Sequence, residues 1–137
     1  MGFIVVGVDG SETSRAAFRV AVKEAVWRNT SLLALHVVSN PIMTGYEAAS
    51  LLRMAQETGE GFVADELELL EKEYPDGFPV EVTSRVSIGH AGGELLDAAQ
   101  PGDGEPAELV VLGSRGFGGF RGLLLGSVTT YAAHHLN

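Results

Sequence analysis

The sequence predicts an α/β fold in which a parallel sheet forms the middle of three layers and helices cover both of its faces. Short runs of apolar, mostly β-branched residues recur along the chain, as expected for strands buried on both faces. Segments with apolar residues at helical spacing separate these runs, which indicates right-handed βαβ units. At 137 residues and 45% hydrophobic content, the chain is expected to form one domain over residues 1–137.

The first strand and the first helix are predicted within residues 3–29. Residues 3–8 form a nearly continuous apolar run that predicts a buried strand. Ser11 is the expected N-cap of the helix that follows, and its apolar periodicity stops at Asn29. The residues expected on the inner face of this helix are Ala16, Ala17, Val20, Ala21 and Val26.

A second strand and a long helix follow. Residues 32–38 predict another buried strand, and residues 47–74 predict a helix. Gly59 and Gly61 are expected to loosen this helix near its middle, because glycine is a weak helix former. The residues expected on its inner face are Leu51, Leu52, Ala55, Phe62, Leu67 and Leu70.

The second half of the chain continues the alternation. Residues 80–86 predict a third strand, residues 94–99 a short helix, and residues 109–112 a fourth strand. A glycine-dense segment covers residues 113–126, and a last helix is expected from about Ser127. Because parallel sheets bind ligands beyond the carboxyl ends of their strands, the loops that begin at Asp9 and Gly113 are the candidate binding segments.

Composition argues against several classes of protein. A net charge of -9 with only 9 Lys and Arg argues against a nucleic-acid partner, which needs a concentrated basic face. The chain has no cysteine, which excludes disulfides, thiolate chemistry and cysteine-ligated metals. No apolar run approaches the roughly 18 residues of a membrane helix, and the apolar start is interrupted at Asp9, too early for a signal peptide. A cytoplasmic protein without a membrane partner is expected.

The segment 113–126 carries the clearest sign of ligand binding, with six glycines in fourteen positions. Such a segment lets backbone N–H groups approach an anion, and the helix expected from Ser127 adds free N–H groups and a partial positive charge. Arg115 and Arg121 add local positive charge. The pattern predicts a phosphate site, and the alternative is a flexible loop in which Ser127 is only an N-cap. Neither the Walker pattern nor the dinucleotide fingerprint is present.

Four ordered signatures identify a resemblance that spans nearly the whole chain. Gly113, Gly116, Gly126 and Ser127 follow the spacing Gly, two residues, Gly, nine residues, Gly-Ser. The further signatures are Val6-Gly-Val-Asp-Gly-Ser11, Leu35-His-Val-Val38, and Gly89-His90 after the third strand. With these motifs the sequence resembles the ATP-binding branch of the universal stress protein family, whose fold is that of the adenine-nucleotide α-hydrolases.

The resemblance implies that ATP lies across the carboxyl ends of the strands, with any Mg²⁺ carried mainly by the phosphates and water. It assigns the adenine and ribose to Asp9 and Val37, with Val8 and Leu112 as walls of the base site. It assigns the phosphates to Gly113, Gly116, Gly126, Ser127, Val128 and Thr129, with Arg115 at the variable position of the motif. The alternative for Asp9 is a turn residue that caps the first helix.

Two features depart from the family pattern. Family members usually end with a further strand, roughly Pro-Val-x-Val-Val, which often pairs two subunits, whereas this sequence stops at Asn137. Either the sequence is truncated or the final edge strand is missing, and a homodimer formed by the usual route is left open. Ala91 follows Gly89-His90 where a proline is common, which changes the expected geometry beside the ribose.

The predicted function is that of a regulatory ATP-binding protein in the stress response, in which nucleotide occupancy controls structure or choice of partner. No catalytic residue and no metal-binding residue is predicted, because the sequence contains no nucleophile elbow and no clearly placed general base. His36 is expected to be a packing residue at the end of its strand. Two alternatives stay open: an interaction module of the same fold that binds no nucleotide, and a slow metal-assisted ATPase or related transferase.

Overall fold

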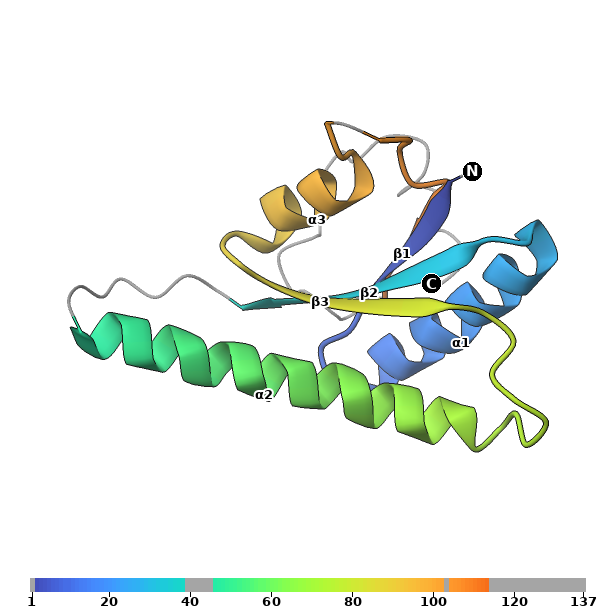
Figure 1. Ribbon diagram of the computed structural model, residues 1–137, viewed down its shortest axis with the longest axis horizontal. Coiled ribbons are helices and arrows are strands. Elements are labelled where there is room, and N and C mark those ends of the chain that lie inside the picture. The colour runs from blue at the N-terminus through green and yellow to red at the C-terminus, as the bar shows by residue number, and fades with distance from the viewer. Residues whose placement is uncertain (1, 39–45, 103, 114–137) are drawn as a thin grey trace.

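The computed structural model describes residues 2–38, 46–102 and 104–113. Along this part of the chain the elements are β1 (Phe3–Gly7), α1 (Glu12–Arg28), β2 (Ser31–Val38), α2 (Tyr46–Glu71), β3 (Val82–Ile88), α3 (Ala91–Ala99) and β4 (Leu109–Val111). The strands pair in parallel in the order β3-β2-β1-β4. Helices α1 and α2 cover one face of the sheet and α3 covers the other (Figure 1), so the predicted three-layer α/β fold is confirmed.

Side chains of β1, β2 and β4 alternate between two apolar clusters, as the period of a strand requires. On the α1 and α2 side lie Ile4, Val6, Val8, Leu32, Ala34, Leu109 and Val111, packed against Ala17, Phe18, Ala21, Val22, Ala25, Val63 and Leu70. On the α3 side lie Val5, Leu35, Val110 and Leu112, packed against Leu95, Ala98 and Ala107. Because β1 and β4 are buried on both faces, their apolar runs do not alternate with polar residues, whereas the edge strand β3 exposes Thr83, Ser84 and Arg85.

Helix α1 begins and ends as predicted. Ser11 is its N-cap and accepts a hydrogen bond from the Ser14 amide, and Asn29 ends it with φ at 56°. The predicted inner face is only partly right, because Ala17 and Ala21 are buried whereas Ala16 is exposed and Val26 is 50% exposed. The buried stripe is rotated toward Phe18, Val22 and Ala25, since the bulky Phe18 fills the space under the helix.

Helix α2 ends at Glu71, three residues before the predicted end at Tyr74, and differs from its prediction in two further respects. It is one continuous helix from Tyr46 to Glu71, so the expected loosening at Gly59 and Gly61 is wrong. Two residues expected on the inner face, Leu51 and Phe62, are 43% and 41% exposed. Leu70, which was predicted inside, is buried, and the predicted Leu67 packs partly buried against the core. The other buried positions of the helix are Gly59, Val63 and Glu66. Gly59 belongs to this face because a Cβ there would lie 2.6 Å from Cδ2 of His36, so only glycine lets the helix backbone close on β2.

The two glycines of α2 yield a paired prediction. Gly61→Ala should raise the free energy of unfolding by about 0.5–1 kcal/mol, because nothing lies within 4 Å of the added methyl group and alanine favours the helix. Gly59→Ala should lower it by about 1–3 kcal/mol through overpacking against His36 and Val86. Denaturant unfolding of both variants checks this, and equal shifts in the same direction would contradict the assigned role of Gly59.

Two boundaries in the second half also differ. The third strand runs from Val82 to Ile88 rather than over residues 80–86, because Val80 packs against the α1 and α2 side before the strand begins. Helix α3 begins at Ala91, three residues before the predicted start at Glu94. Its glycines are weak helix formers, but burial of Leu95 and Ala98 against the sheet holds the helix in place. None of the helices in the described ranges is both long and apolar enough to span a membrane.

Candidate functional site

The strand order reverses beside β1. The chain passes from β1 to β2 and β3 in one direction and then returns to place β4 on the other side of β1. Val6 pairs with Val111, so continuing the register by two residues brings Val8 level with Gly113. In sheets of this kind the crevice at such a reversal binds ligands at the carboxyl ends of the strands. The candidate site therefore lies where Asp9 follows β1 and Gly113 follows β4.

Gly113 lies directly against the first turn of α1. A Cβ at this position would stand 2.6 Å from the carbonyl carbon of Thr13, 2.7 Å from its oxygen and 2.8 Å from the Ser14 nitrogen. These are backbone atoms and cannot turn away as a side chain can. The glycine thus allows the end of β4 to touch the start of α1, and the glycine-rich segment begins at that contact.

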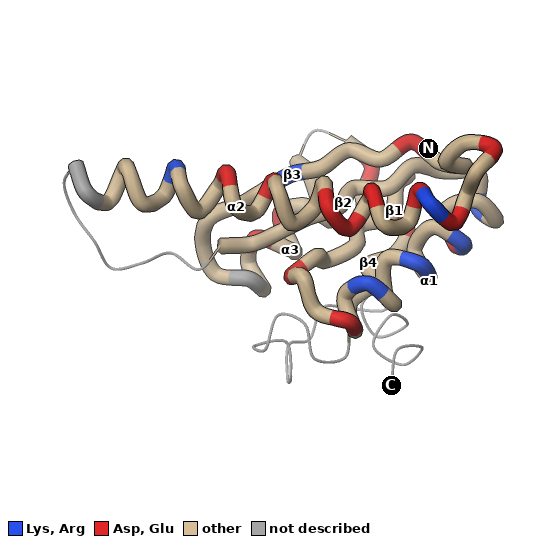
Figure 2. Tube along the Cα trace, turned by 90° about the horizontal axis from the view of Figure 1, so that it is seen from below, with Lys and Arg blue, Asp and Glu red and all other residues tan. Residues whose placement is uncertain are grey.

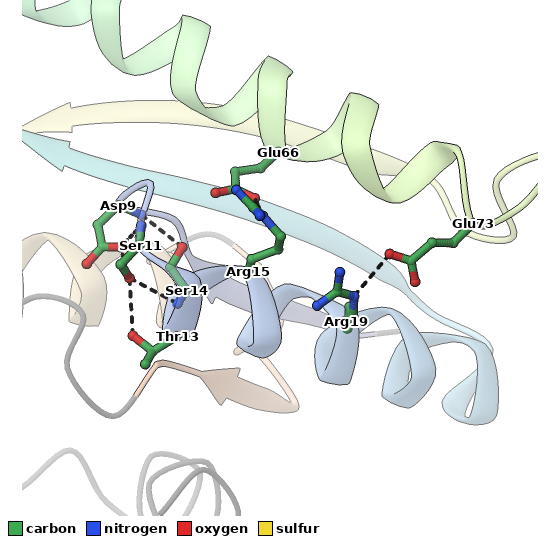
Figure 3. A network of polar contacts seen from close by, with 8 residues as sticks. All are labelled: Asp9, Ser11, Thr13, Ser14, Arg15, Arg19, Glu66 and Glu73. Carbon is green, nitrogen blue, oxygen red and sulfur yellow. Dashed lines mark hydrogen bonds and ion pairs between the residues drawn. The ribbon is translucent and has the colours of Figure 1, made fainter.

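The loop between β1 and α1 is organised by the Asp9 carboxylate (Figure 3). Its Oδ1 accepts hydrogen bonds from the Ser11 amide at 2.9 Å and from the Ser11 hydroxyl at 2.6 Å. The Ser11 hydroxyl oxygen in turn accepts from the Ser14 amide at 3.1 Å. Asp9 therefore orients the N-cap, as the turn-residue alternative anticipated. Its contact with a ligand remains a prediction.

Two side chains hold the peptide unit between Val8 and Asp9. Nδ1 of His36 lies 2.7 Å from the Val8 carbonyl oxygen, and the Asp9 amide donates to the Ser14 hydroxyl oxygen at 3.1 Å. His36 is thus partly buried and packs at its strand end, as predicted, but it also makes a specific hydrogen bond that sequence reasoning missed. Ser14 was missed as well, although its spacing of three residues from the N-cap is typical of residues near a helix start.

The other predicted contacts of the base lie on different faces of the sheet. Val8 is fully buried among the residues that face α1 and α2. Leu112 is 6% exposed and belongs, with the partly buried Val37, to the cluster that faces α3. The side chains of Leu112 and Val37 are therefore on one side and that of Val8 is on the other. Asp9 and Gly113 both lie beside the first turn of α1, at the strand ends.

The remaining predicted site residues lie outside the described part of the chain: Arg115, Gly116, Gly126, Ser127, Val128 and Thr129. Their roles stay predictions. Within residues 2–38, 46–102 and 104–113, no three His, Asp or Glu side chains gather as a set of metal ligands.

Charge is distributed unevenly around the site. Basic residues gather on α1 and acidic residues along α2 (Figure 2). Arg15, on the second turn of α1, is bound to the buried Glu66 at 2.9 Å, and Arg19 is bound to Glu73 at 3.0 Å. Both arginines are therefore already engaged in ion pairs within the described part of the chain.

The sequence was compared with known protein families and proteins, and the matches fall in one family. The sequence matches the universal stress protein family over residues 2–137. A universal stress protein from Mycolicibacterium smegmatis is 37% identical over 135 residues, which cover 95% of this chain and 41% of that protein. One from Mycobacterium tuberculosis is 35% identical over 125 residues, covering 91% of this chain and 39% of that protein. The chain thus spans about two fifths of the length of these curated relatives.

Solved structures share the fold. The universal stress protein UspA from Lactobacillus plantarum superposes with a TM-score of 0.67 at 24% identity, covering 98% of this chain and 91% of that one. A universal stress protein in complex with cAMP gives a TM-score of 0.52 at 21% identity, covering 98% and 88%. A universal stress protein family protein from Arabidopsis thaliana with AMP bound gives 0.52 at 20% identity, covering 100% and 87%.

Proposed function

Because the chain belongs to the universal stress protein family, we propose that it binds an adenine nucleotide, preferentially ATP, at the carboxyl ends of β1 and β4. The observation that carries this proposal is the meeting of Asp9, Gly113 and the first turn of α1 at the strand reversal. A reversal of this kind is where α/β sheets bind nucleotides. The AMP and cAMP complexes of proteins with the same fold support an adenine nucleotide as the ligand class.

The proposed roles divide between two ends of the ligand. Asp9 would accept hydrogen bonds from the ribose hydroxyls or the adenine amino group, with Val37, Leu112 and the backbone of Val8 beside the base. The phosphates would lie over the glycine-rich segment, held by its amides and by the start of the last helix. The Gly113, Gly116, Gly126 and Ser127 motif supports this assignment. Any Mg²⁺ would be held by the phosphates and water.

In this proposal the nucleotide regulates and is not turned over. A bound ligand shifts a protein toward whichever conformation or assembly binds it better. We therefore expect ATP occupancy to change the protein's shape, its partner or its pairing with a second copy. The expected compartment is the cytoplasm. The stress response is the setting that family membership suggests.

The direct test asks whether the purified protein holds or binds nucleotide. Mass spectrometry of the supernatant after denaturation should detect a carried-over adenine nucleotide, and titration calorimetry should detect binding of added ATP or AMP. Absence of both carry-over and binding would reject the proposal in favour of an interaction module with an empty site. Release of phosphate above the buffer rate with Mg²⁺ or Mn²⁺ would instead favour the slow ATPase.

The glycine motif yields a prediction of its own. Gly126→Asp should weaken ATP binding by about a hundredfold, because it places a negative charge and a side chain where the phosphates are expected. Calorimetry measures the change. Gly102→Asp is the matched control, since Gly102 lies in an exposed loop with nothing within 4 Å of an added Cβ. Equal affinity of the two variants would exclude the motif from the phosphate site.

A further inference from the structure

The peptide unit that joins Val8 to Asp9 is held from both sides by side chains. The Val8 carbonyl oxygen lies 2.7 Å from Nδ1 of His36, and the Asp9 amide donates to the Ser14 hydroxyl at 3.1 Å. We propose that His36 is a positioning residue for nucleotide binding, which acts by holding this peptide and so the Asp9 carboxylate. The inference rests on the function proposed above.

The geometry explains how a residue that need not touch the ligand can control its affinity. A carbonyl oxygen can only accept, so Nδ1 of His36 carries the proton and donates it. Since a peptide unit is planar, fixing both its oxygen and its N–H fixes its rotation. That rotation sets the direction in which the Asp9 side chain leaves the backbone. The carboxylate is then oriented further by the Ser11 amide and hydroxyl.

The ring of His36 is itself held between β2 and α2. Its centroid lies 5.5 Å from that of Phe62, at an interplanar angle of 49°. Gly59 brings the helix backbone so close that an added Cβ would stand 2.6 Å from Cδ2 of the ring. Phe62 also reaches the loop, because its Cδ1 lies 3.5 Å from the position of a Cβ on Gly10. Helix α2 thus holds the His36 ring in place, and His36 in turn holds the peptide between Val8 and Asp9.

The chain offers a matched control at the opposite end of β1. There the Thr30 hydroxyl donates to the Gly2 carbonyl, again across a separation of 28 residues. Both bonds tie a backbone carbonyl beside β1 to a distant side chain, but only the His36 bond lies at the carboxyl edge. A general contribution to stability should appear in both, and a contribution to binding should appear only at His36.

The experiment compares His36→Ala, His36→Asn and Thr30→Val by calorimetry with ATP and with AMP, alongside denaturant unfolding. His36→Ala should weaken nucleotide binding about tenfold, the loss expected when one hydrogen bond no longer orients a binding group. His36→Asn should recover most of this affinity, because its amide nitrogen can donate to the Val8 carbonyl. Thr30→Val should lose stability and keep the affinity of the wild type.

The outcomes separate the inference from the function on which it rests. If the wild type binds nucleotide and His36→Ala binds it equally well, the inference is overturned and the proposed function stands. If the three variants lose affinity only in proportion to their stability, His36 is merely structural and the inference again fails. If the wild type binds neither nucleotide, the proposed function fails and the inference with it.

Ser14→Ala keeps the test decisive should His36→Ala fail to fold. It removes the acceptor of the Asp9 amide on the other side of the same peptide and deletes only one oxygen atom. It should also weaken nucleotide binding about tenfold. Unchanged affinity in this variant would show that the peptide need not be held, and would overturn the inference.

Discussion

Gly113→Ala is expected to lower the free energy of unfolding by about 1–3 kcal/mol, the usual cost of overpacking, and to reduce nucleotide binding below detection. The added Cβ would stand 2.6 Å from the carbonyl carbon of Thr13 and 2.8 Å from the Ser14 nitrogen. Both are backbone atoms of the first turn of α1, so β4 and α1 must move apart. That movement would separate the glycine-rich segment from Asp9.

The stability lost in Gly113→Ala comes from steric overlap and not from backbone strain, because Gly113 is not among the glycines with positive φ. Gly102→Ala is the matched control, since its added methyl group meets nothing within 4 Å. It should unfold within about 0.5 kcal/mol of the wild type, as a surface substitution does. Thermal or denaturant unfolding with calorimetry checks both variants. A Gly113→Ala protein with wild-type stability would contradict the close contact between β4 and α1.

Arg15→Ala is expected to cost about 2 kcal/mol of stability, because it leaves the Glu66 carboxylate buried without its cation. The side chain of Glu66 is 4% exposed and that of Arg15 is 34% exposed, so water reaches only one end of the pair. Breaking a fully buried pair costs about 3–5 kcal/mol, and the exposure of Arg15 reduces this figure. Denaturant unfolding measures the loss.

The neighbouring pair, between α1 and the turn that follows α2, is the control. Arg19 and Glu73 are 47% and 45% exposed, so Arg19→Ala should change the free energy of unfolding by less than about 1 kcal/mol. Combining Arg15→Met with Glu66→Leu should restore most of the stability lost in Arg15→Ala, since an apolar pair can replace a buried ion pair. If Arg15→Ala were no more costly than Arg19→Ala, burial of Glu66 would not matter to the fold.

Burial on both faces made the fold predictable from the sequence. The apolar runs that became β1 and β4 contain no polar residue that would mark a solvent-facing side, and His36 alone interrupts the run over residues 32–38 that became most of β2. This pattern is typical of a parallel sheet between two helical layers. The two ends of α1, at Ser11 and Asn29, could also be predicted from the sequence, because helix capping depends on residues close in sequence.

Helix α2 was harder to predict because two of its inward residues are not apolar. Glu66 lies inside only because Arg15 of another helix neutralises it, and Gly59 lies inside because the backbone there touches His36. The spacing of apolar residues cannot identify either position as inward-facing. It therefore placed Phe62 inside, whereas the ring lies 41% exposed beside the loop that carries Asp9.

By itself the sequence determined the family, the three-layer class and the two strand-end loops that carry Asp9 and Gly113, because these depend on local burial patterns and on motif spacing. Only the tertiary structure decided the strand order, the contact of Gly113 with α1, and the support of the Val8–Asp9 peptide by His36. The physical reason is that these contacts join residues far apart along the chain, at distances set by how helices and strands pack rather than by any spacing in the sequence.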